Sequence, residues 1–271
     1  MIIVQISDSH ISIDSPIRAA RLGDLERTVA EIRRLDPVPD LVVHTGDITQ
    51  NGLPEEYRAA RDSLDRLPAP LYVIPGNRDR RAAMYDAFEN SILTGPGPAK
   101  TPFLQYAIEG HALRLIMLDT LSRKTNLGVF DPDRLAELAA LLAAEPEHPT
   151  ALFMHHPPFD VPGARDPFQF ADRGEAAALG DLLQAHRQVI GLSCGHTHRF
   201  APTTFAGRPA MTIASIAGDL RKGCPDDAAM ENTDFLIHRF DSARGLGSER
   251  ISVPRRTAPA AGAGVHDGMA S

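Results

Sequence analysis

Short apolar runs and longer amphipathic segments alternate along most of the chain. Five aliphatic runs are only four or five residues long, which is typical of buried strands, and they span residues 2–6, 41–44, 71–74, 151–154 and 189–193. Elsewhere, apolar residues recur every three or four positions, which predicts helices at residues 18–35, 55–67, 80–90, 132–144 and 175–186. Strands that alternate with helices favour an α/β fold.

The middle and the C-terminal region are richer in strands. A pair of strands joined by a Glu-Gly-His turn is predicted at residues 103–108 and 113–119, and further strands at 209–215, 235–240 and 249–253. The pattern as a whole predicts two mixed sheets packed on each other and flanked by helices. We expect one domain over residues 1–254, whose β-rich part at 206–254 could form a dimer edge. A disordered tail rich in Ala, Gly and Pro is expected over 255–271.

Composition and charge narrow the class of protein. The 271 residues are 43% hydrophobic, which is enough for one large core, and a net charge of −7 without a basic tract argues against duplex nucleic acid as a partner. Two cysteines, Cys194 and Cys224, are too few for a disulfide framework. No leader-like segment precedes the first strand and no apolar run reaches about 18 residues, so we expect a cytoplasmic protein without a membrane span.

Polar side chains follow each of the five apolar runs, at the point where the predicted strand ends. The clusters are Asp8-Ser9-His10, Gly46-Asp47, Gly76-Asn77-Arg78-Asp79, His155-His156 and Gly195-His196-Thr197-His198. Each cluster taken alone fits an ordinary turn or a surface position. Because ligands of open α/β sheets bind at the carboxyl ends of the strands, the five clusters together predict one shared site.

The residue types in these clusters are those of an open metal centre. Calcium would take mostly oxygen ligands and a structural zinc would take thiolates, so a mixture of Asp, His and Asn favours two divalent ions of Mn, Fe, Zn or Co. Asp47 is the natural candidate for a bridging carboxylate. Two ions bring roughly four positive charges, and Asp8, Asp47 and one hydroxide remove three of them. About one positive charge is left to bind a phosphodiester anion.

In this order, the clusters resemble the signature of the calcineurin-like metallophosphoesterases over essentially residues 1–215. The chain looks like the branch that holds bacterial cyclic-nucleotide phosphodiesterases and glycerophosphodiesterases. The resemblance implies a four-layer α/β/β/α sandwich, a homodimer or higher homo-oligomer, and hydrolysis of 3′,5′-cyclic nucleotides or glycerophosphodiesters by in-line attack of a metal-bridging hydroxide. It also implies two ligand sets: Asp8, His10, Asp47 and His198 for one ion, and Asp47, Asn77, His155 and His196 for the other.

The chain departs from the family at Arg78, where the family usually has a histidine that contacts the phosphate and assists the leaving group. An arginine binds phosphoryl groups through charge and paired hydrogen bonds, but its pKa above about 12 prevents proton donation near neutral pH. We expect Asn77, Arg78 and His156 to contact the substrate and to form, with Asp47, the catalytic set. Water or His156 would protonate the leaving group. The alternative is that Arg78 turns away and pairs with Asp79.

For two further features, the sequence leaves alternative interpretations open. Consecutive residues at a strand end point in opposite directions, so only one of His155 and His156 should bind metal, and the resemblance favours His155. The loop at residues 162–170 is expected to pack locally on the surface. The alternative is that it closes over the substrate and that Phe168 or Phe170 stacks on a base.

Three other functions compete with a phosphodiesterase. A phosphomonoesterase on the same scaffold must bind an extra negative charge, which Arg78 could help to do. A nuclease would want a basic groove for the backbone, which the acidic composition disfavours. A catalytically inactive scaffold that only binds other proteins would have lost ligand positions, whereas each position is filled in this chain.

Overall fold

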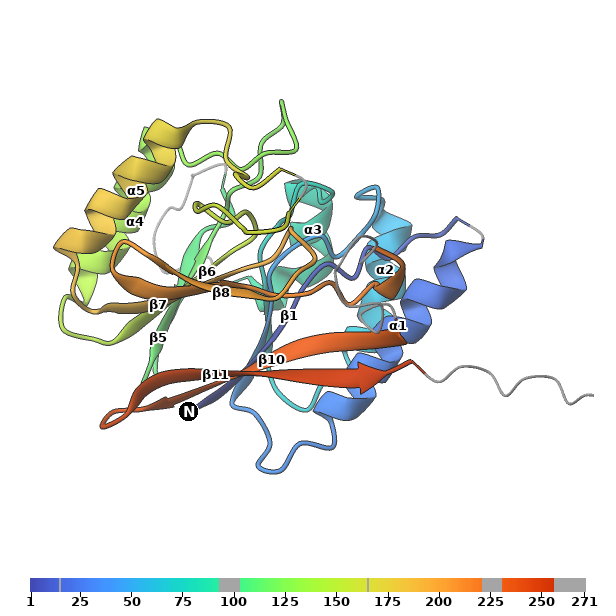
Figure 1. Cartoon of the computed structure of the whole chain (residues 1–271). Helices are drawn as coiled ribbons and strands as arrows, with labels where there is room; N and C mark the ends of the chain where they lie inside the picture. Colours follow the sequence, from blue (N-terminus) through green and yellow to red (C-terminus); the bar gives the residue numbers. More distant parts are fainter. Residues whose placement is uncertain (15, 93–102, 165, 221–230, 256–271) are drawn as a thin grey trace, which may run out of the picture.

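Two mixed sheets form the centre of the fold in the computed structural model, which describes residues 1–14, 16–92, 103–164, 166–220 and 231–255 (Figure 1). The five-stranded sheet has the order β11-β10-β1-β2-β3, formed by Gly245–Pro254, Asn232–Asp241, Ile2–Ile6, Leu41–His44 and Leu71–Val73. The six-stranded sheet has the order β4-β5-β6-β7-β9-β8, formed by Tyr106–Ile108, Arg114–Leu118, Thr150–Met154, Val189–Cys194, Arg208–Thr212 and Ala201–Phe205.

Helices cover the outer faces of the two sheets (Figure 1). The apolar faces of α1 (Ile17–Ile32), α2 (Pro54–Leu64) and α3 (Arg81–Phe88) are buried in one core with the five-stranded sheet. Those of α4 (Pro132–Ala144) and α5 (Arg173–Ala185) are buried in a second core on the six-stranded sheet. Short 3-10 helices span Glu89–Ser91 and Gly218–Leu220. The predicted four-layer α/β/β/α sandwich is therefore confirmed.

A buried polar contact ties the two sheets together near their carboxyl ends. Gln5 in β1 donates through Nε2 to Thr45 Oγ1 at 3.0 Å, and its Oε1 accepts from Ser193 Oγ in β7 at 2.6 Å. Strands β1, β2 and β3 are parallel to one another, and so are β5, β6 and β7. Because each parallel set ends at one edge of its sheet, this link holds the carboxyl ends of β1 and β7 close together.

Several predicted elements differ from the structure at their ends. The first helix ends at Ile32 instead of residue 35, and the strand predicted from residue 103 begins at Tyr106. Strand β8 was not predicted, because its half-exposed sequence Ala-Pro-Thr-Thr-Phe lacks an apolar run; it pairs with β9 across a turn in which Ala206 has a φ of 50°. Cys224 and all of the predicted tail except Arg255 lie outside the described residues. No described helix has the length and apolar character that crossing a membrane requires.

Candidate metal centre

The ends of the strands bring the predicted ligand residues to one place. After β1 and β2, the Asp8 N–H donates to the Gly46 carbonyl at 3.0 Å, and the His10 N–H donates to the Asp47 carbonyl at 2.9 Å. The loop after β7, in the other sheet, joins them through the His196 N–H, which donates to Asp8 Oδ2 at 3.0 Å. Segments nearly 190 residues apart thus meet because hydrogen bonds to the backbone fix the strand ends to one another.

The backbone of this site adopts a conformation that is rare for residues with a side chain. Six described non-glycine residues have a φ between 45° and 71°, and five of them are predicted ligands: Asp8, His10, Asp47, His196 and His198. Such strain persists only where the surroundings enforce it, and it gathers at functional sites. Gly76 shows how tightly the loops approach, because a Cβ there would lie 2.2 Å from Asp47 Oδ1.

The first donor set is formed by two histidines and two carboxylates. His10 Nε2 lies 3.2 Å from His198 Nε2 and 3.5 Å from Asp47 Oδ2, and His198 Nε2 lies 3.4 Å from Asp8 Oδ1. Asp8 is fully buried, and its Oδ1 has no hydrogen-bond partner in the described part of the chain. Because an uncompensated buried carboxylate oxygen is costly, this arrangement fits a bound cation.

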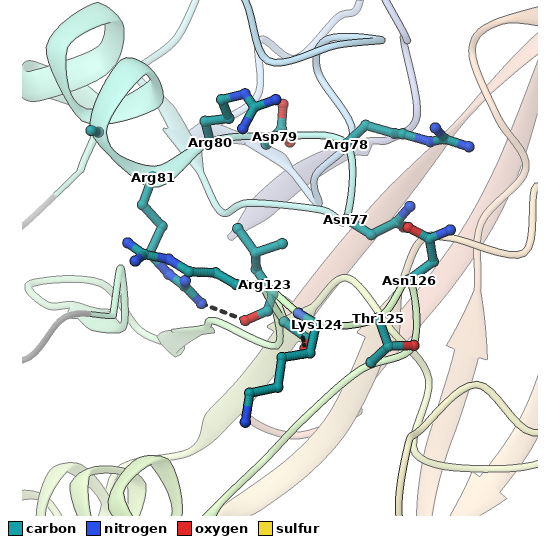
Figure 2. Close-up of a pocket in the computed structure, with 12 residues that line it drawn as sticks. Asn77, Arg78, Asp79, Arg80, Arg81, Arg123, Lys124, Thr125 and Asn126 are labelled. Atoms are coloured by element: carbon teal, nitrogen blue, oxygen red, sulfur yellow. Dashed lines mark hydrogen bonds between the residues drawn. The ribbon is translucent and has the colours of Figure 1, made fainter.

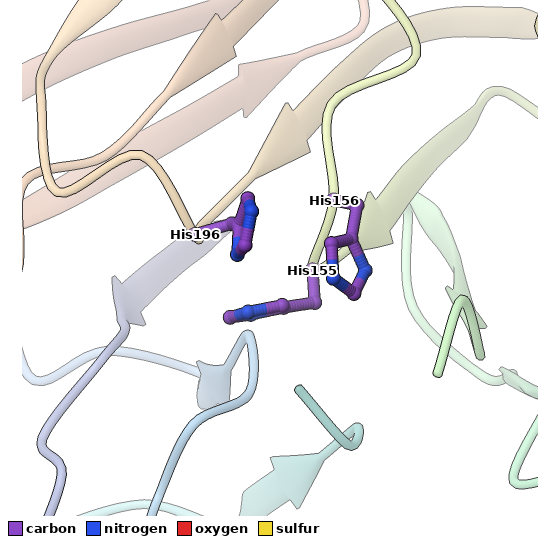
Figure 3. A group of neighbouring side chains, drawn as sticks. All are labelled: His155, His156 and His196. Atoms are coloured by element: carbon purple, nitrogen blue, oxygen red, sulfur yellow. The ribbon is translucent and has the colours of Figure 1, made fainter. Parts of the chain in front are cut away.

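The second donor set lies beside the first and shares Asp47 with it. His155 Nε2 lies 3.2 Å from Asn77 Oδ1 and 3.6 Å from Asp47 Oδ2. The His196 ring faces the His155 ring with 5.0 Å between centroids (Figure 3). Asp47 Oδ2 thus lies near His10 of the first set and His155 of the second, so Asp47 could contribute a ligand to both sets.

Hydrogen bonds fix which ring nitrogen is free in three of the four predicted histidine ligands. Each partner is a carbonyl oxygen, which only accepts, so the bonded nitrogen carries the proton and the other keeps its lone pair for a metal. The partners are Thr45 O for His155 Nδ1 at 2.7 Å, Leu220 O for His198 Nδ1 at 3.3 Å, and Gln169 Oε1 for His196 Nε2 at 2.8 Å.

Gln169 is a functional candidate that the sequence analysis missed. It comes from the loop at residues 162–170, and its Nε2 donates to the Asp166 carbonyl, so that its Oε1 faces His196. The loop sequence is rich in Pro and Gly and carries no motif that would single out a glutamine. Only the path of the loop places this amide beside the donor sets.

The aromatic residues of the same loop pack locally. Phe170 is 2% exposed and belongs to the core beneath α4 and α5. Phe168 is half-buried, and its ring lies 3.9 Å from the Arg173 guanidinium. The structure therefore favours local packing over the alternative of base stacking for both rings.

His156 lies in the same histidine cluster, beside His155 and His196 (Figure 3). Its ring is fully buried, with Nε2 donating to the Asn126 carbonyl at 3.1 Å and Nδ1 accepting from Thr120 Oγ1 at 2.8 Å. Neither nitrogen is free to protonate a leaving group. Of the two predicted proton sources, this geometry favours water.

Interactions with neighbouring histidines outweigh the effect of burial on the pKa values of the two carboxylates in the cluster. Burial acts to raise the pKa of Asp47, but the charges of His155 and His10 lower this pKa to about 2. Burial likewise acts to raise the pKa of Asp8, but His10 and His198 beside its carboxylate hold this pKa well below its usual value. Burial acts to lower the pKa of His155, but Asp47 raises it to about 9. Both carboxylates are ionised at neutral pH, and divalent ions would displace the proton that His155 carries.

Arg78 follows Asn77 on the loop after β3, and its side chain is exposed. Its backbone N–H donates to Asp47 Oδ1 at 2.7 Å. The described residues include no ion pair between Arg78 and Asp79, whose buried carboxylate instead accepts from the N–H groups of Ile48 and Gly76. The side chain is thus not held by its neighbour, and it lines a cavity beside the donor sets (Figure 2).

This cavity has a volume of about 710 Å³ and lies between residues 77–82 and residues 121–126 (Figure 2). Asn77 belongs both to its lining and to the second donor set. The Asn126 side of the cavity adjoins His156, which bonds the Asn126 carbonyl. A ligand in this space can therefore reach the candidate metal centre.

Comparisons with known proteins support, independently of the site geometry, the resemblance to the calcineurin-like phosphoesterases. The family model described as calcineurin-like phosphoesterase matches residues 1–200. A protein of Arcobacter nitrofigilis named probable glycerophosphodiester phosphodiesterase GpdQ is 34% identical over 272 residues, which cover 96% of each chain. The 3′,5′-cyclic adenosine monophosphate phosphodiesterase CpdA of Escherichia coli strain K12 is 27% identical, over 82% of this chain and 78% of its own. A dimetal phosphatase structure from Danio rerio shares the fold, with a TM-score of 0.70 and 16% identity over 94% of this chain and 99% of that one.

Proposed function

This chain belongs to the calcineurin-like phosphoesterase family, and from this premise we propose that it is a phosphodiesterase that uses two divalent metal ions to hydrolyse small phosphodiesters. One observation carries the proposal: two donor sets share Asp47, whose Oδ2 lies 3.5 Å from His10 Nε2 and 3.6 Å from His155 Nε2. The mixture of carboxylate, imidazole and amide donors suits Mn, Fe, Zn or Co.

The residues of the chain have distinct roles in this proposal. Bound metal ions would supply Lewis acidity to the phosphoryl oxygens and would acidify water. Asp47 holds the two donor sets together, and its geometry is fixed by the Arg78 N–H. The exposed Arg78 guanidinium binds a phosphoryl oxygen, and Asn77 orients the same group from the edge of the cavity. His156 acts as a positioning residue, because its ring packs on the His196 ring with 4.4 Å between centroids.

Small diesters are the proposed substrates. The two relatives compared above carry the names of a glycerophosphodiesterase and a cyclic-nucleotide phosphodiesterase, and the first of them aligns with this chain over nearly its whole length. A cavity of about 710 Å³ has the size of a small-molecule site. We therefore propose glycerophosphodiesters as the first class to test and 3′,5′-cyclic nucleotides as the second.

The test is steady-state hydrolysis by manganese-reconstituted protein. The substrates are glycerophosphocholine, cyclic AMP, bis(p-nitrophenyl) phosphate and p-nitrophenyl phosphate, and metal content is measured in parallel. Asp47→Ala should abolish hydrolysis and reduce the bound metal from about two ions per chain. Asp181→Ala, at an exposed carboxylate on the outer helix α5, is the matched control and should leave both unchanged. Preference for the monoester, or no hydrolysis by protein that binds two ions, would overturn the diesterase proposal.

A homodimer formed through the C-terminal strands is also proposed. Strand β11 lies at the edge of its sheet, and no described strand pairs with its outer side. Light scattering coupled to gel filtration tests this proposal. A monomeric mass at micromolar concentration would contradict it.

A further inference from the structure

The cavity beside the donor sets carries far more positive charge than the chain as a whole. The protein has a net charge of −7, yet five cationic side chains line this one space: Arg78, Arg80, Arg81, Arg123 and Lys124. They come from two segments separated by about 40 residues of sequence, on opposite sides of the cavity (Figure 2). Only one carboxylate, that of Asp79, is among the lining residues.

Internal pairing accounts for only one of these cations. Arg81 forms a double salt bridge with the buried Asp119, with Nε 2.5 Å from Oδ2 and Nη2 2.7 Å from Oδ1. Asp79 is 4% exposed, and its carboxylate accepts hydrogen bonds from groups that include Thr49 Oγ1 and the Tyr57 hydroxyl. Neither acidic group is left to neutralise the rest of the cavity.

The other four cations have no ion pair with a described carboxylate. Arg80 bonds only a neutral group, the Asn51 carbonyl, at 3.3 Å. Arg78, Arg123 and Lys124 are exposed and form no ion pair within the described part of the chain. With the described residues alone considered, the cavity therefore holds about four positive charges without an ion-pair partner, next to a candidate site for two divalent ions.

A simple phosphodiester does not account for this much charge. Its single negative charge is already matched by the metal centre, which retains about one positive charge, and by Arg78. A choline or other cationic group in the cavity would be repelled by Arg80, Arg123 and Lys124. An uncharged nucleoside or sugar would leave the three cations without a partner.

We propose that the substrate is a phosphodiester with a second anionic group, a phosphate or a carboxylate, which binds to Arg123 and Lys124 while the diester lies at Asn77. This inference rests on the proposed function and adds the class of substrate. The shared chemistry is an anion with several oxygen acceptors, which arginine and lysine side chains recognise.

Paired substrates test the inference. Glycerophosphoinositol 4-phosphate differs from glycerophosphoinositol by one phosphate, and glycerophosphoserine differs from glycerophosphoethanolamine by one carboxylate. We expect the more anionic member of at least one pair to have a kcat/KM about tenfold higher, because two exposed contacts contribute about threefold each. The pair that responds identifies the second group as phosphate or carboxylate.

The double variant Arg123→Ala/Lys124→Ala should bring this kcat/KM ratio back to about one. Arg187→Ala, at an exposed arginine in the turn between α5 and β7, is the matched control and should keep the wild-type ratio. Calorimetry gives a readout that does not depend on activity: the double variant, treated with EDTA, should bind glycerophosphoinositol 4-phosphate several-fold more weakly than wild type if the phosphate pair responds.

The outcomes separate the inference from the proposed function. If bis(p-nitrophenyl) phosphate, cyclic AMP and all four glycerophosphodiesters are inert, the proposed function fails. If the members of both pairs are hydrolysed with equal kcat/KM, the proposed function stands and the second anion site is refuted. The site is also refuted if a preference for the more anionic member persists in the double variant.

Discussion

Replacement of Gln169 by leucine should weaken the binding of one metal ion while leaving the fold intact. The Gln169 backbone is held by the Gly128 N–H, which donates to the Gln169 carbonyl at 2.8 Å, so the loop path does not depend on the side chain. The side chain supplies the only described acceptor for His196 Nε2, at 2.8 Å. Without it, the imidazole is free to carry its proton on Nδ1, the nitrogen left for the metal.

The expected loss follows from two physical contributions. Leaving the His196 N–H without its partner costs about 1–3 kcal/mol. Partners that orient a metal-bound histidine change metal affinity by about 10–100-fold, which is about 1.4–2.7 kcal/mol. The two estimates of the free-energy cost agree, so the second ion should bind about 10–100-fold more weakly, whereas the first donor set should keep its affinity for metal.

This prediction is checked by titrating metal-free protein with Mn²⁺, with the heat of binding and the amount of bound metal measured at each step. The matched control is Gln188→Leu, because Gln188 is also 8% exposed but donates to the Leu142 carbonyl far from the donor sets. The control should lower Tm without changing either affinity. Wild-type affinity for both ions in Gln169→Leu, with a similar loss of Tm, would refute the reasoning.

Three further predictions concern other residues. Gly195→Ala places a Cβ 2.2 Å from Ser7 Oγ, so kcat/KM should fall by about 100-fold, whereas Gly180→Ala, with contacts no closer than 3.5 Å, should retain activity. Arg78→His should add a group that titrates near neutral pH and should favour substrates with poor leaving groups; unchanged pH–rate profiles and leaving-group dependence would exclude Arg78 from the chemistry. Burial lowers the pKa of His238 from 6.5 to about 4, so the neutral, buried imidazole contributes its full share of the free energy of unfolding above pH 6.5. This contribution is lost as the pH falls toward 4, by about 3 kcal/mol. In denaturant titrations, His238→Gln should flatten this loss of unfolding free energy, and an unchanged slope would contradict the assignment.

The elements with strong periodicity were predictable because their local pattern decides their structure. Strands β1 and β2 and helix α4 have the predicted bounds, since a short aliphatic run or an amphipathic stretch behind Pro132 favours one conformation regardless of its neighbours. Strand β8 was missed because pairing with β9, and not its own hydrophobicity, makes it a strand.

The candidate ligands could also be predicted from the sequence, because each one directly follows a strand whose end is visible in the apolar pattern. That these residues bind two metal ions stays a prediction. The structure adds that Asp8, Asp47 and His155 lie within one cluster and that their loops share backbone hydrogen bonds.

The sequence by itself determined the layered fold and the set of candidate donor residues, since both depend on short-range patterns and on the order of strands. Only the tertiary structure decided which groups surround those donors. Gln169 accepts a hydrogen bond from His196, and Thr120 donates one to His156. Both bonds join segments that no local sequence pattern relates. The basic cavity has the same origin. The cations of residues 78–81 and 123–124 count as one patch only because two loops face each other across the same space, and sequence spacing does not encode that distance.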